Sequence, residues 1–232
     1  MSEQMIFKRT EIKYMINEEI FNELIKLMND YMVADVHGRS TIFSLYFDTP
    51  HFLMIRRSLE HPLYKEKLRL RSYGIAQPDT MVFVEIKKKY DSVVYKRRVS
   101  MTEADAERYL IKKEKVMDTQ ISREIDYCLD NYDGIAPAMM LSYEREAYYE
   151  KNNHEFRVTF DRNILWRNYD LSFQKGAYGY PLLKDGQVLM EVKTGGAIPL
   201  WMVRFLSENH IYKAAFTKYG EAYRALYSQS EH

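Results

Sequence analysis

The sequence contains a single cysteine, Cys128, and no long run of apolar residues among its 232 positions. One cysteine excludes a disulfide bond within the chain and fits a reducing compartment. No stretch reaches the roughly 20 apolar residues that a helix needs to cross a bilayer. The first residues also lack the basic and apolar regions of a signal peptide. We therefore expect a cytoplasmic protein with no membrane segment in this chain.

The chain also has little net charge, because 34 Lys and Arg against 33 Asp and Glu leave a formal charge of +1 at pH 7. A protein that coats nucleic acid usually shows a strong basic excess, so we expect no specific nucleic-acid partner. The acids gather in stretches with a helical pattern, such as 102–107, whereas many bases lie in alternating stretches. Charge that is segregated without a net excess favours a focused internal site over a uniformly basic surface.

Three familiar motifs are missing. The histidines show no metal-ligand spacing, and no Ser-His-Asp arrangement is recognisable. Gly195-Gly196 follows Lys193, but no G-K-[ST] sequence comes after it, so a plain turn is favoured over a phosphate-binding P-loop. We assign no role to the histidines, which are His37, His51, His61, His154, His210 and His232.

What the chain does contain is charge at every second position in several segments. The clearest is Lys67-Leu68-Arg69-Leu70-Arg71. Because a β-strand points alternate side chains to opposite faces, the three bases share one face and the two leucines share the other. One such strand is typical of a solvated sheet face, but several predict strands that gather cations around a common space, whose natural occupant is a polyanion. The alternation recurs at 84–89, 96–98, 141–148, 156–161 and 189–193.

Apolar periodicity and turn residues give the expected elements. Asn17 is expected to cap the first helix, Ser100 with Glu103 the third and Ser122 the fourth, while Pro199 opens the fifth. A turn is expected at Asp91-Ser92. Strands are expected at 6–14, 41–47, 63–73, 80–90, 93–99, 138–149, 155–163 and 187–193, helices at 17–29, 51–58, 100–113, 122–131, 199–209 and 218–227, and a mobile loop at 168–186.

The connections decide the fold class. Strands joined mostly by turns favour an antiparallel α+β architecture, and we expect a single domain over 1–232, because no repeat or linker is visible. To bring the basic faces together the sheet must curl, ideally into a closed barrel.

A closed lumen of this kind would gather Lys and Arg whose charges repel one another, so a chain of phosphates would relieve the strain. Arg binds phosphate oxygens with its planar fork, and Lys supplies compact point charges. On this reasoning, changing Arg69 and Arg71 together to alanine is expected to spare or raise the melting temperature of the ligand-free protein.

Acidic residues accompany these bases. Carboxylates that face phosphate repel it unless a divalent cation lies between them, which predicts Mg²⁺ or Mn²⁺ on oxygen ligands. The candidate metal ligands are Glu191, Glu11 and Glu85. For Glu85 and Glu191 a salt bridge to a neighbouring lysine is the alternative. The acids in phase with the bases are Glu11, Glu85, Asp161 and Glu191.

Nine short motifs occur in order along nearly the whole chain: Arg9-Thr10-Glu11-Ile12-Lys13-Tyr14, Tyr46-Phe47-Asp48-Thr49, Lys67-Leu68-Arg69-Leu70-Arg71-Ser72-Tyr73-Gly74, Phe83-Val84-Glu85-Ile86-Lys87, Tyr95-Lys96-Arg97-Arg98, Ser142-Tyr143-Glu144-Arg145-Glu146-Ala147-Tyr148, Arg157-Val158-Thr159-Phe160-Asp161, Met190-Glu191-Val192-Lys193 and Phe216-Thr217-Lys218-Tyr219-Gly220. Together they resemble the VTC domain, the polyphosphate polymerase domain of the vacuolar transporter chaperone complex, in the CYTH-like superfamily of triphosphate tunnel metalloenzymes. The resemblance implies an antiparallel eight-stranded β-barrel tunnel with flanking helices.

The same resemblance implies ATP-dependent polyphosphate synthesis that requires Mn²⁺ or Mg²⁺, with ATP, triphosphate and polyphosphate as partners. Glu191 would be the principal metal ligand. The catalytic phosphate path would comprise Lys13, Arg69, Arg71, Lys87, Arg145, Arg157, Lys193 and Lys218, and further substrate contacts would come from Lys67, Lys89, Lys96, Arg98, Tyr73 and Tyr143.

Three functions stay open. Arg9 stands where the wider superfamily opens with the first Glu of E-x-E-x-K, which leaves Glu11 and Lys13 and favours a polymerase over a hydrolase. An inorganic triphosphatase would use the same tunnel with water as the acceptor. A non-catalytic polyphosphate or inositol-phosphate sensor would keep the bases and turn over no nucleotide.

Overall fold

The computed structural model describes residues 10–91 and 93–228. The expected strand residues 6–9, including Arg9 of the first motif, and Ser92 of the expected turn lie outside the described residues. Within those that are described, no helix combines the length and the apolar character that crossing a membrane requires.

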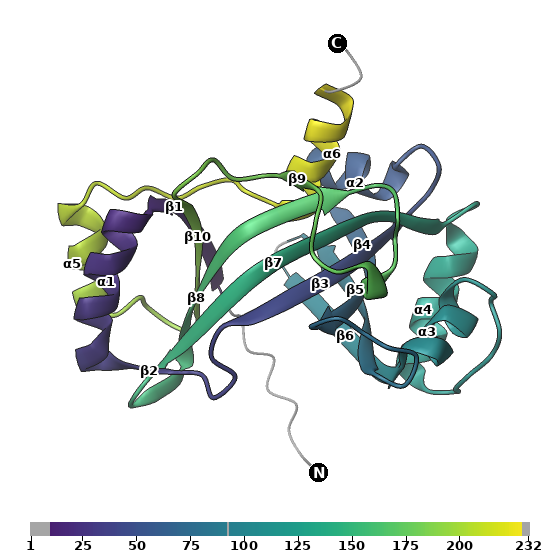
Figure 1. The fold of residues 1–232 in the computed structure, drawn as a ribbon, viewed down its shortest axis with the longest axis horizontal. Coiled ribbons are helices and arrows are strands. Elements are labelled where there is room, and N and C mark those ends of the chain that lie inside the picture. The colour runs from purple at the N-terminus through teal and green to yellow at the C-terminus, as the bar shows by residue number, and fades with distance from the viewer. Residues whose placement is uncertain (1–9, 92, 229–232) are drawn as a thin grey trace. The chain divides into compact units, whose positions relative to one another are not determined.

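Strands and helices follow the predicted order (Figure 1). Two short strands and a 3₁₀ turn were not predicted. The strands are β1 Thr10–Asn17, β2 Met32–Ala34, β3 Ser40–Asp48, β4 Tyr64–Tyr73, β5 Met81–Tyr90, β6 Val93–Thr102, β7 Ala136–Glu150, β8 Asn153–Arg167, β9 Tyr180–Pro181 and β10 Gln187–Thr194; the helices are α1 Glu18–Tyr31, α2 Leu53–Leu59, α3 Glu103–Leu110, α4 Gln120–Asn131, α5 Leu200–Glu208 and α6 Lys218–Ser228, with the 3₁₀ turn η1 Phe173–Lys175.

The strands form one antiparallel sheet with the order β1-β10-β8-β7-β3-β4-β5-β6, to which β2 adds beside β7 and β9 beside β8. The antiparallel α+β class is therefore confirmed. The expected closed barrel is not found, because among the described residues β1 and β6 end the order and are not paired with each other. Alternation along a strand fixes which side chains share a face, but it carries no information about whether the two end strands meet.

The chain divides into two compact units, each built from three segments. Unit 1 comprises Met1–Ser40, Glu144–Asn163 and Leu183–Phe216, and unit 2 comprises Thr41–Tyr143, Ile164–Leu182 and Thr217–His232. That the whole chain acts as one domain stays a prediction.

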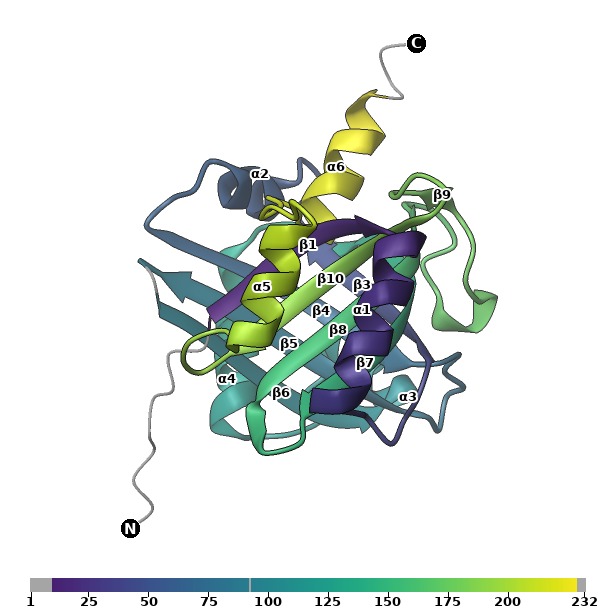
Figure 2. The same ribbon diagram turned by 90° about the vertical axis from the view of Figure 1, so that its left-hand side faces the viewer.

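In unit 1 the sheet consists of β1-β10-β8 followed by the end of β7, which pairs with β2, and α1 and α5 lie side by side over one face of it (Figure 2). Alternate residues such as Ile16, Met190 and Phe160 face the helices and form the core with them. The Oδ1 atom of Asn17 accepts a hydrogen bond of 2.8 Å from the backbone N–H of Ile20, which confirms the predicted cap of α1. The opposite, polar face of these strands is left for other contacts.

In unit 2 the apolar face of β3–β6 packs on α3 and α4, with Leu68, Leu70, Val84 and Ile86 fully or almost fully buried. Lys67, Arg69 and Arg71 point to the other face, as the alternation predicted.

The predicted caps of α3 and α4 were wrong by two or three residues. Ser100 continues β6 opposite Phe83, so α3 starts later and Thr102 caps it by accepting from the N–H of Asp105. For α4, Thr119 is the cap and Ser122 is its reciprocal partner in the capping box. Neighbouring Ser and Thr residues are equally good caps, so position along the sequence did not separate them.

The loop after β8 is tied to one buried guanidinium. Arg167 donates hydrogen bonds of 3.0–3.1 Å to backbone carbonyls of Asp170, Ser172, Gly176 and Tyr178. Its side chain is fully buried. The segment 168–186, predicted to be a mobile loop, thus contains η1, β9 and a fixed network of hydrogen bonds.

Candidate functional site

Unit 2 carries a polar sheet face that we call the cationic face. Cross-strand pairing defines it: Arg69 lies opposite Tyr46 and Glu85, and Lys87 lies opposite Lys67 and Lys96. Side chains of directly opposed residues share one face of the sheet. The members of the cationic face are Ser44, Tyr46, Lys67, Arg69, Arg71, Glu85, Lys87, Lys96 and Arg98.

Glu85 lies at the centre of this face and is 2% exposed. The Nη2 and Nε atoms of Arg69 lie 2.6 and 2.8 Å from its Oε2, and the Nζ of Lys96 lies 2.8 Å from its Oε1. Burial raises the pKa of the Glu85 carboxyl, but the charges of Arg69, Arg71 and Lys96 outweigh that effect and lower it to about 2. The salt-bridge alternative therefore accounts for Glu85 here, and its role as a metal ligand stays a prediction.

Arg71 is held by two hydroxyl groups. Its Nη2 lies 3.1 Å from the hydroxyl of Tyr143 and 3.4 Å from Oγ of Ser44. The Nζ of Lys218 lies 4.7 Å from the centre of the Tyr143 ring, a cation–π distance. Arg71, Tyr143 and Lys218 are thus brought together, and their contact with phosphate stays a prediction.

Positive charge exceeds negative charge on the cationic face. On β4, β5 and β6 this face holds one carboxylate, Glu85, and six cations, which are Lys67, Arg69, Arg71, Lys87, Lys96 and Arg98. Lys65 and Lys89, directly opposed, continue the row beyond Lys67. Burial, followed by the charges of Lys89 and Lys87, lowers the pKa of Lys65. Tyr73 lies at the other end of β4 in an edge-to-face contact with Phe83. A half-buried face with this charge excess is suited to an anion with many charges.

Unit 1 carries the second group, which we call the acid–base cluster. Its members are Glu11, Lys13, Arg145, Asp161, Glu191 and Lys193. Glu191 lies opposite Lys13 across β1 and β10, and Glu11 lies opposite Lys193. The Nζ of Lys13 is 3.6 Å from Glu11 and 3.9 Å from Glu191, and the Nζ of Lys193 is 4.0 and 3.7 Å from the same two carboxylates. Two lysines therefore bridge two carboxylates.

Arg145 closes this cluster on one side. Its Nε and Nη2 each lie 2.6 Å from the fully buried carboxylate of Asp161, and Nη2 lies 3.3 Å from Glu191. A bidentate pair of this kind fixes the guanidinium plane. Arg157, which the sequence placed on the same path, instead extends to Asp35 at 2.9 Å and is about half exposed.

The donor set decides whether a divalent cation fits. Within residues 10–91 and 93–228, no three His, Cys, Asp or Glu side chains come together in a group that could hold a metal ion. Glu11 and Glu191 nevertheless share two lysine neighbours, and their oxygens are the hard donors that Mg²⁺ and Mn²⁺ prefer. Mg²⁺ commonly takes only one or two carboxylates, with water and phosphate oxygens completing its shell. The pair fits that arrangement.

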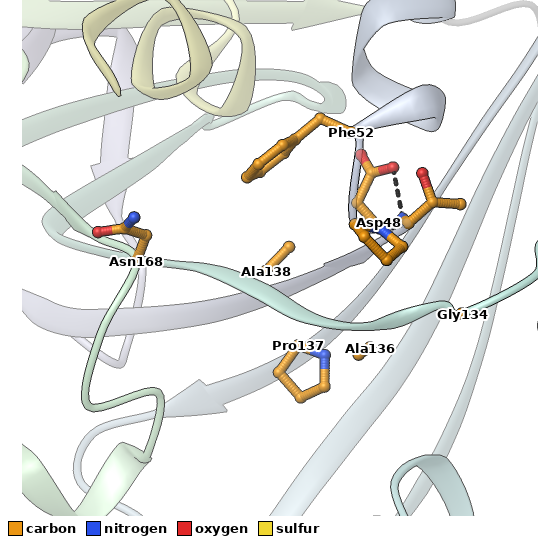
Figure 3. Close-up of a pocket in the computed structure, with 9 residues that line it drawn as sticks. Asp48, Phe52, Gly134, Ala136, Pro137, Ala138 and Asn168 are labelled. Atoms are coloured by element: carbon orange, nitrogen blue, oxygen red, sulfur yellow. Dashed lines mark hydrogen bonds between the residues drawn. The ribbon is translucent and has the colours of Figure 1, made fainter. Parts of the chain in front are cut away.

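A shallow pocket of about 230 Å³ lies elsewhere in unit 2 (Figure 3). Asp48 is its one carboxylate, and it already accepts hydrogen bonds from the N–H groups of Thr49, Met54 and Ile55 and from the hydroxyl of Tyr219. Burial raises the pKa of Asp48. None of the lining residues is basic, so this pocket does not suit phosphate; they are Asp48, Thr49, Pro50, Phe52, Gly134, Ala136, Pro137, Ala138 and Asn168.

Sequence reasoning placed the cations of both groups but missed Ser44 and Tyr46. The signal was available, because both alternate with Phe43, Leu45 and Phe47 in β3 and therefore share the polar phase. The hydroxyl of Tyr46 accepts a hydrogen bond of 3.0 Å from Nη1 of Arg69.

Comparison with known proteins gives one family and one fold. The model of the VTC domain matches residues 8–227. No curated protein sequence matches the chain. A Bacillus halodurans protein provisionally described as an adenylate cyclase is similar in structure, with a TM-score of 0.57, 13% identity, and 89% of this chain and 92% of that chain covered. A Vibrio parahaemolyticus protein with the same description has a TM-score of 0.48 and 13% identity, with 90% of this chain and 94% of that chain covered. At such low identity the first likeness shows a shared fold alone.

Proposed function

This chain belongs to the VTC domain family, and from that membership and its charged faces we propose that it transfers the γ-phosphate of ATP to a growing inorganic polyphosphate chain. The observation that carries the proposal is the cationic face, where β4, β5 and β6 together present six Lys and Arg and one carboxylate. A linear chain of phosphates has a charge at every repeat and can use such a row, whereas a small monoanion cannot.

The cationic face would bind and align phosphate. Arg69 and Arg71 suit this role because each is already oriented, the first by Glu85 and Tyr46 and the second by Ser44 and Tyr143. A pre-oriented guanidinium loses little conformational freedom when it takes phosphate oxygens. Phosphoryl transfer depends mainly on such positioning and on stabilisation of charge in the transition state.

The acid–base cluster would hold the cation. Glu191 and Glu11 are the proposed ligands of Mn²⁺ or Mg²⁺, which when bound would neutralise charge on phosphate oxygens at this cluster. Lys13 and Lys193 neutralise these carboxylates in the ligand-free protein, and burial lowers the pKa of Lys193. Both lysines would be available to phosphate oxygens once the carboxylates face a cation.

The test is purified protein with ATP and Mn²⁺, assayed for polyphosphate on gels and for released ADP. Polymer formed in step with ADP supports the proposal. Free phosphate without polymer would show a triphosphatase, and phosphate-chain binding without turnover would show a sensor; either result overturns the polymerase proposal.

A matched pair of variants tests the cationic face itself. Lys87→Ala is expected to weaken tripolyphosphate binding several-fold, because one charge of the row is lost. Arg123→Ala removes one positive charge from an exposed ion pair on α4 and should leave binding unchanged. Equal effects of the two changes would show that only overall charge matters.

A further inference from the structure

Tyr46 is held rigidly within the cationic face. It is 7% exposed, and its ring stacks on Tyr219 with centroids 4.4 Å apart and planes at 16°. Its hydroxyl oxygen accepts a hydrogen bond of 3.0 Å from Nη1 of Arg69, the strand neighbour directly opposite. Stacking and hydrogen bond together fix where the phenol oxygen lies.

Among the described residues, the proton of this hydroxyl has no hydrogen-bond acceptor. Because Arg69 is the donor in their hydrogen bond, the hydroxyl of Tyr46 can donate its own proton only to a different acceptor. In the part of the chain that the structure describes, its hydroxyl makes no other hydrogen bond. A buried hydroxyl without an acceptor costs free energy, and the cations around it favour an anionic acceptor.

We propose that Tyr46 is a phosphate-binding residue, whose neutral hydroxyl donates a hydrogen bond to a phosphate oxygen held by Arg69 and whose ionised form weakens phosphate binding. The inference rests on the proposed function, since it assumes that phosphate binds the cationic face. It adds a neutral donor that was not among the site residues expected from the sequence.

The charges around Tyr46 set the pH at which this donor is lost. Burial raises the pKa of the hydroxyl, but the charges of Arg69, Arg71 and Lys67 outweigh burial and lower it from 10.0 to about 8. Below that pH the phenol can donate; above it the phenolate pairs with Arg69 and repels phosphate. Each pH unit above about 8 should then cost up to tenfold in affinity.

Other groups near Tyr46 also titrate or carry charge. Burial lowers the pKa of Lys96, so loss of its charge will also weaken binding in alkaline solution. A comparison with a variant that lacks only the Tyr46 hydroxyl removes this contribution. The groups that face Tyr46 or its partner Arg69 are Lys67, Arg69 and Arg71 of β4, Glu85 of β5, Lys96 of β6, Tyr143 of β7 and Tyr219 of α6.

The experiment is calorimetric titration of wild type, Tyr46→Phe and Tyr127→Phe with sodium tripolyphosphate between pH 7 and 9.5. Tyr127 is 65% exposed on α4 and serves as the control. At pH 7, Tyr46→Phe should bind roughly tenfold more weakly, the loss expected for a hydrogen bond to a charged group. At pH 9 the ratio of the two dissociation constants should approach one. Protonation of the ligand cancels in that ratio.

A second measurement follows the hydroxyl without ligand. Tyrosinate absorbance of the wild type should show one group that ionises near pH 8, absent from Tyr46→Phe and present in Tyr127→Phe, and tripolyphosphate should move it to higher pH. A ratio of the two dissociation constants that stays constant with pH would mean that Tyr46 has only a structural role. Equal tripolyphosphate binding by wild type and Tyr46→Phe at pH 7 would mean that Tyr46 does not contact phosphate. Either result overturns the inference, but the proposed function stands as long as the wild type binds tripolyphosphate. A wild type that binds no tripolyphosphate at any pH contradicts the proposed function as well.

Discussion

At the scale of single residues, Glu85 decides how the cationic face is held together. Its folded pKa of about 2 lies below the 4.5 of an unperturbed carboxyl, so its ion pairs stabilise the fold fully above about pH 4.5 and are lost as the pH falls towards 2. We expect Glu85→Gln to lower the free energy of unfolding at pH 7 by roughly 3 kcal/mol. Urea denaturation at pH 7, 4 and 3 checks this, because the variant should lose less stability than wild type on acidification. Glu124→Gln, in a partly exposed pair with Lys88, is the control.

The structure changes the expectation for Arg69 and Arg71. Counting like charges predicted that changing both to alanine would spare or raise the melting temperature. Arg69 in fact pairs with buried Glu85 at 2.6 Å, and Arg71 lies 3.9 Å from it, so the double change leaves that carboxylate with Lys96. We now expect a loss of roughly 3 kcal/mol or more in the ligand-free protein. Adding Glu85→Gln to the double variant should restore part of the lost stability. If the effects of the arginine changes and of Glu85→Gln in thermal melts were fully additive, the ion pairs between these residues would be contradicted.

A change at Glu191 is expected to affect metal-dependent turnover of ATP and binding of phosphate chains differently. Glu191→Gln keeps the size of the side chain and removes an anionic ligand, so turnover of ATP with Mn²⁺ should fall about 100-fold or more if metal-dependent stabilisation is lost. Tripolyphosphate affinity should persist or rise, because one repulsive charge is gone. Steady-state kinetics and calorimetry measure the two effects separately. Glu208→Gln, exposed at the end of α5, should change neither, and wild-type turnover in Glu191→Gln would remove this residue from the metal site.

At the scale of elements, strands were predicted well and their partners were not. The period of two in Lys67-Leu68-Arg69-Leu70-Arg71 depends only on local geometry, and β4 and β5 begin within one residue of the prediction. The contact of Arg69 with Glu85 depends on register between strands, which no single segment encodes. For the same reason the sequence identified the cations of the candidate site but not which carboxylate each one meets.

Arg167 makes the loop after β8 into a folded element. Lysine has one nitrogen and cannot reach four carbonyls, so Arg167→Lys should lower the free energy of unfolding by roughly 2 kcal/mol or more through unsatisfied acceptors. Hydrogen exchange should rise in residues 170–178 and stay unchanged in α4. Arg123→Lys, exposed, is the matched control. Unchanged exchange in the loop would show that its own packing is sufficient.

At the scale of the whole molecule, binding of a phosphate chain should be visible as stability. A ligand that binds only the folded state at about 100 times its dissociation constant adds roughly 2.7 kcal/mol. For a chain of this size that corresponds to a rise of roughly 5–10 °C in melting temperature. Scanning calorimetry with tripolyphosphate at low and high NaCl measures it, and the shift should shrink with salt because exposed charges are screened. No shift at low salt would contradict a phosphate site on either unit.

The lone cysteine has a practical consequence for spectroscopy. Cys128 has no exposed surface in the core of unit 2, and burial, followed by the nearby charge of Glu66, raises the pKa of its thiol to about 12. Only a thiolate that can reach a maleimide dye attacks it, so Cys128 should stay unlabelled until that core opens. A cysteine introduced on an exposed strand end could therefore carry a fluorophore without any prior removal of Cys128, and the slow labelling of Cys128 itself would report how often the native core opens.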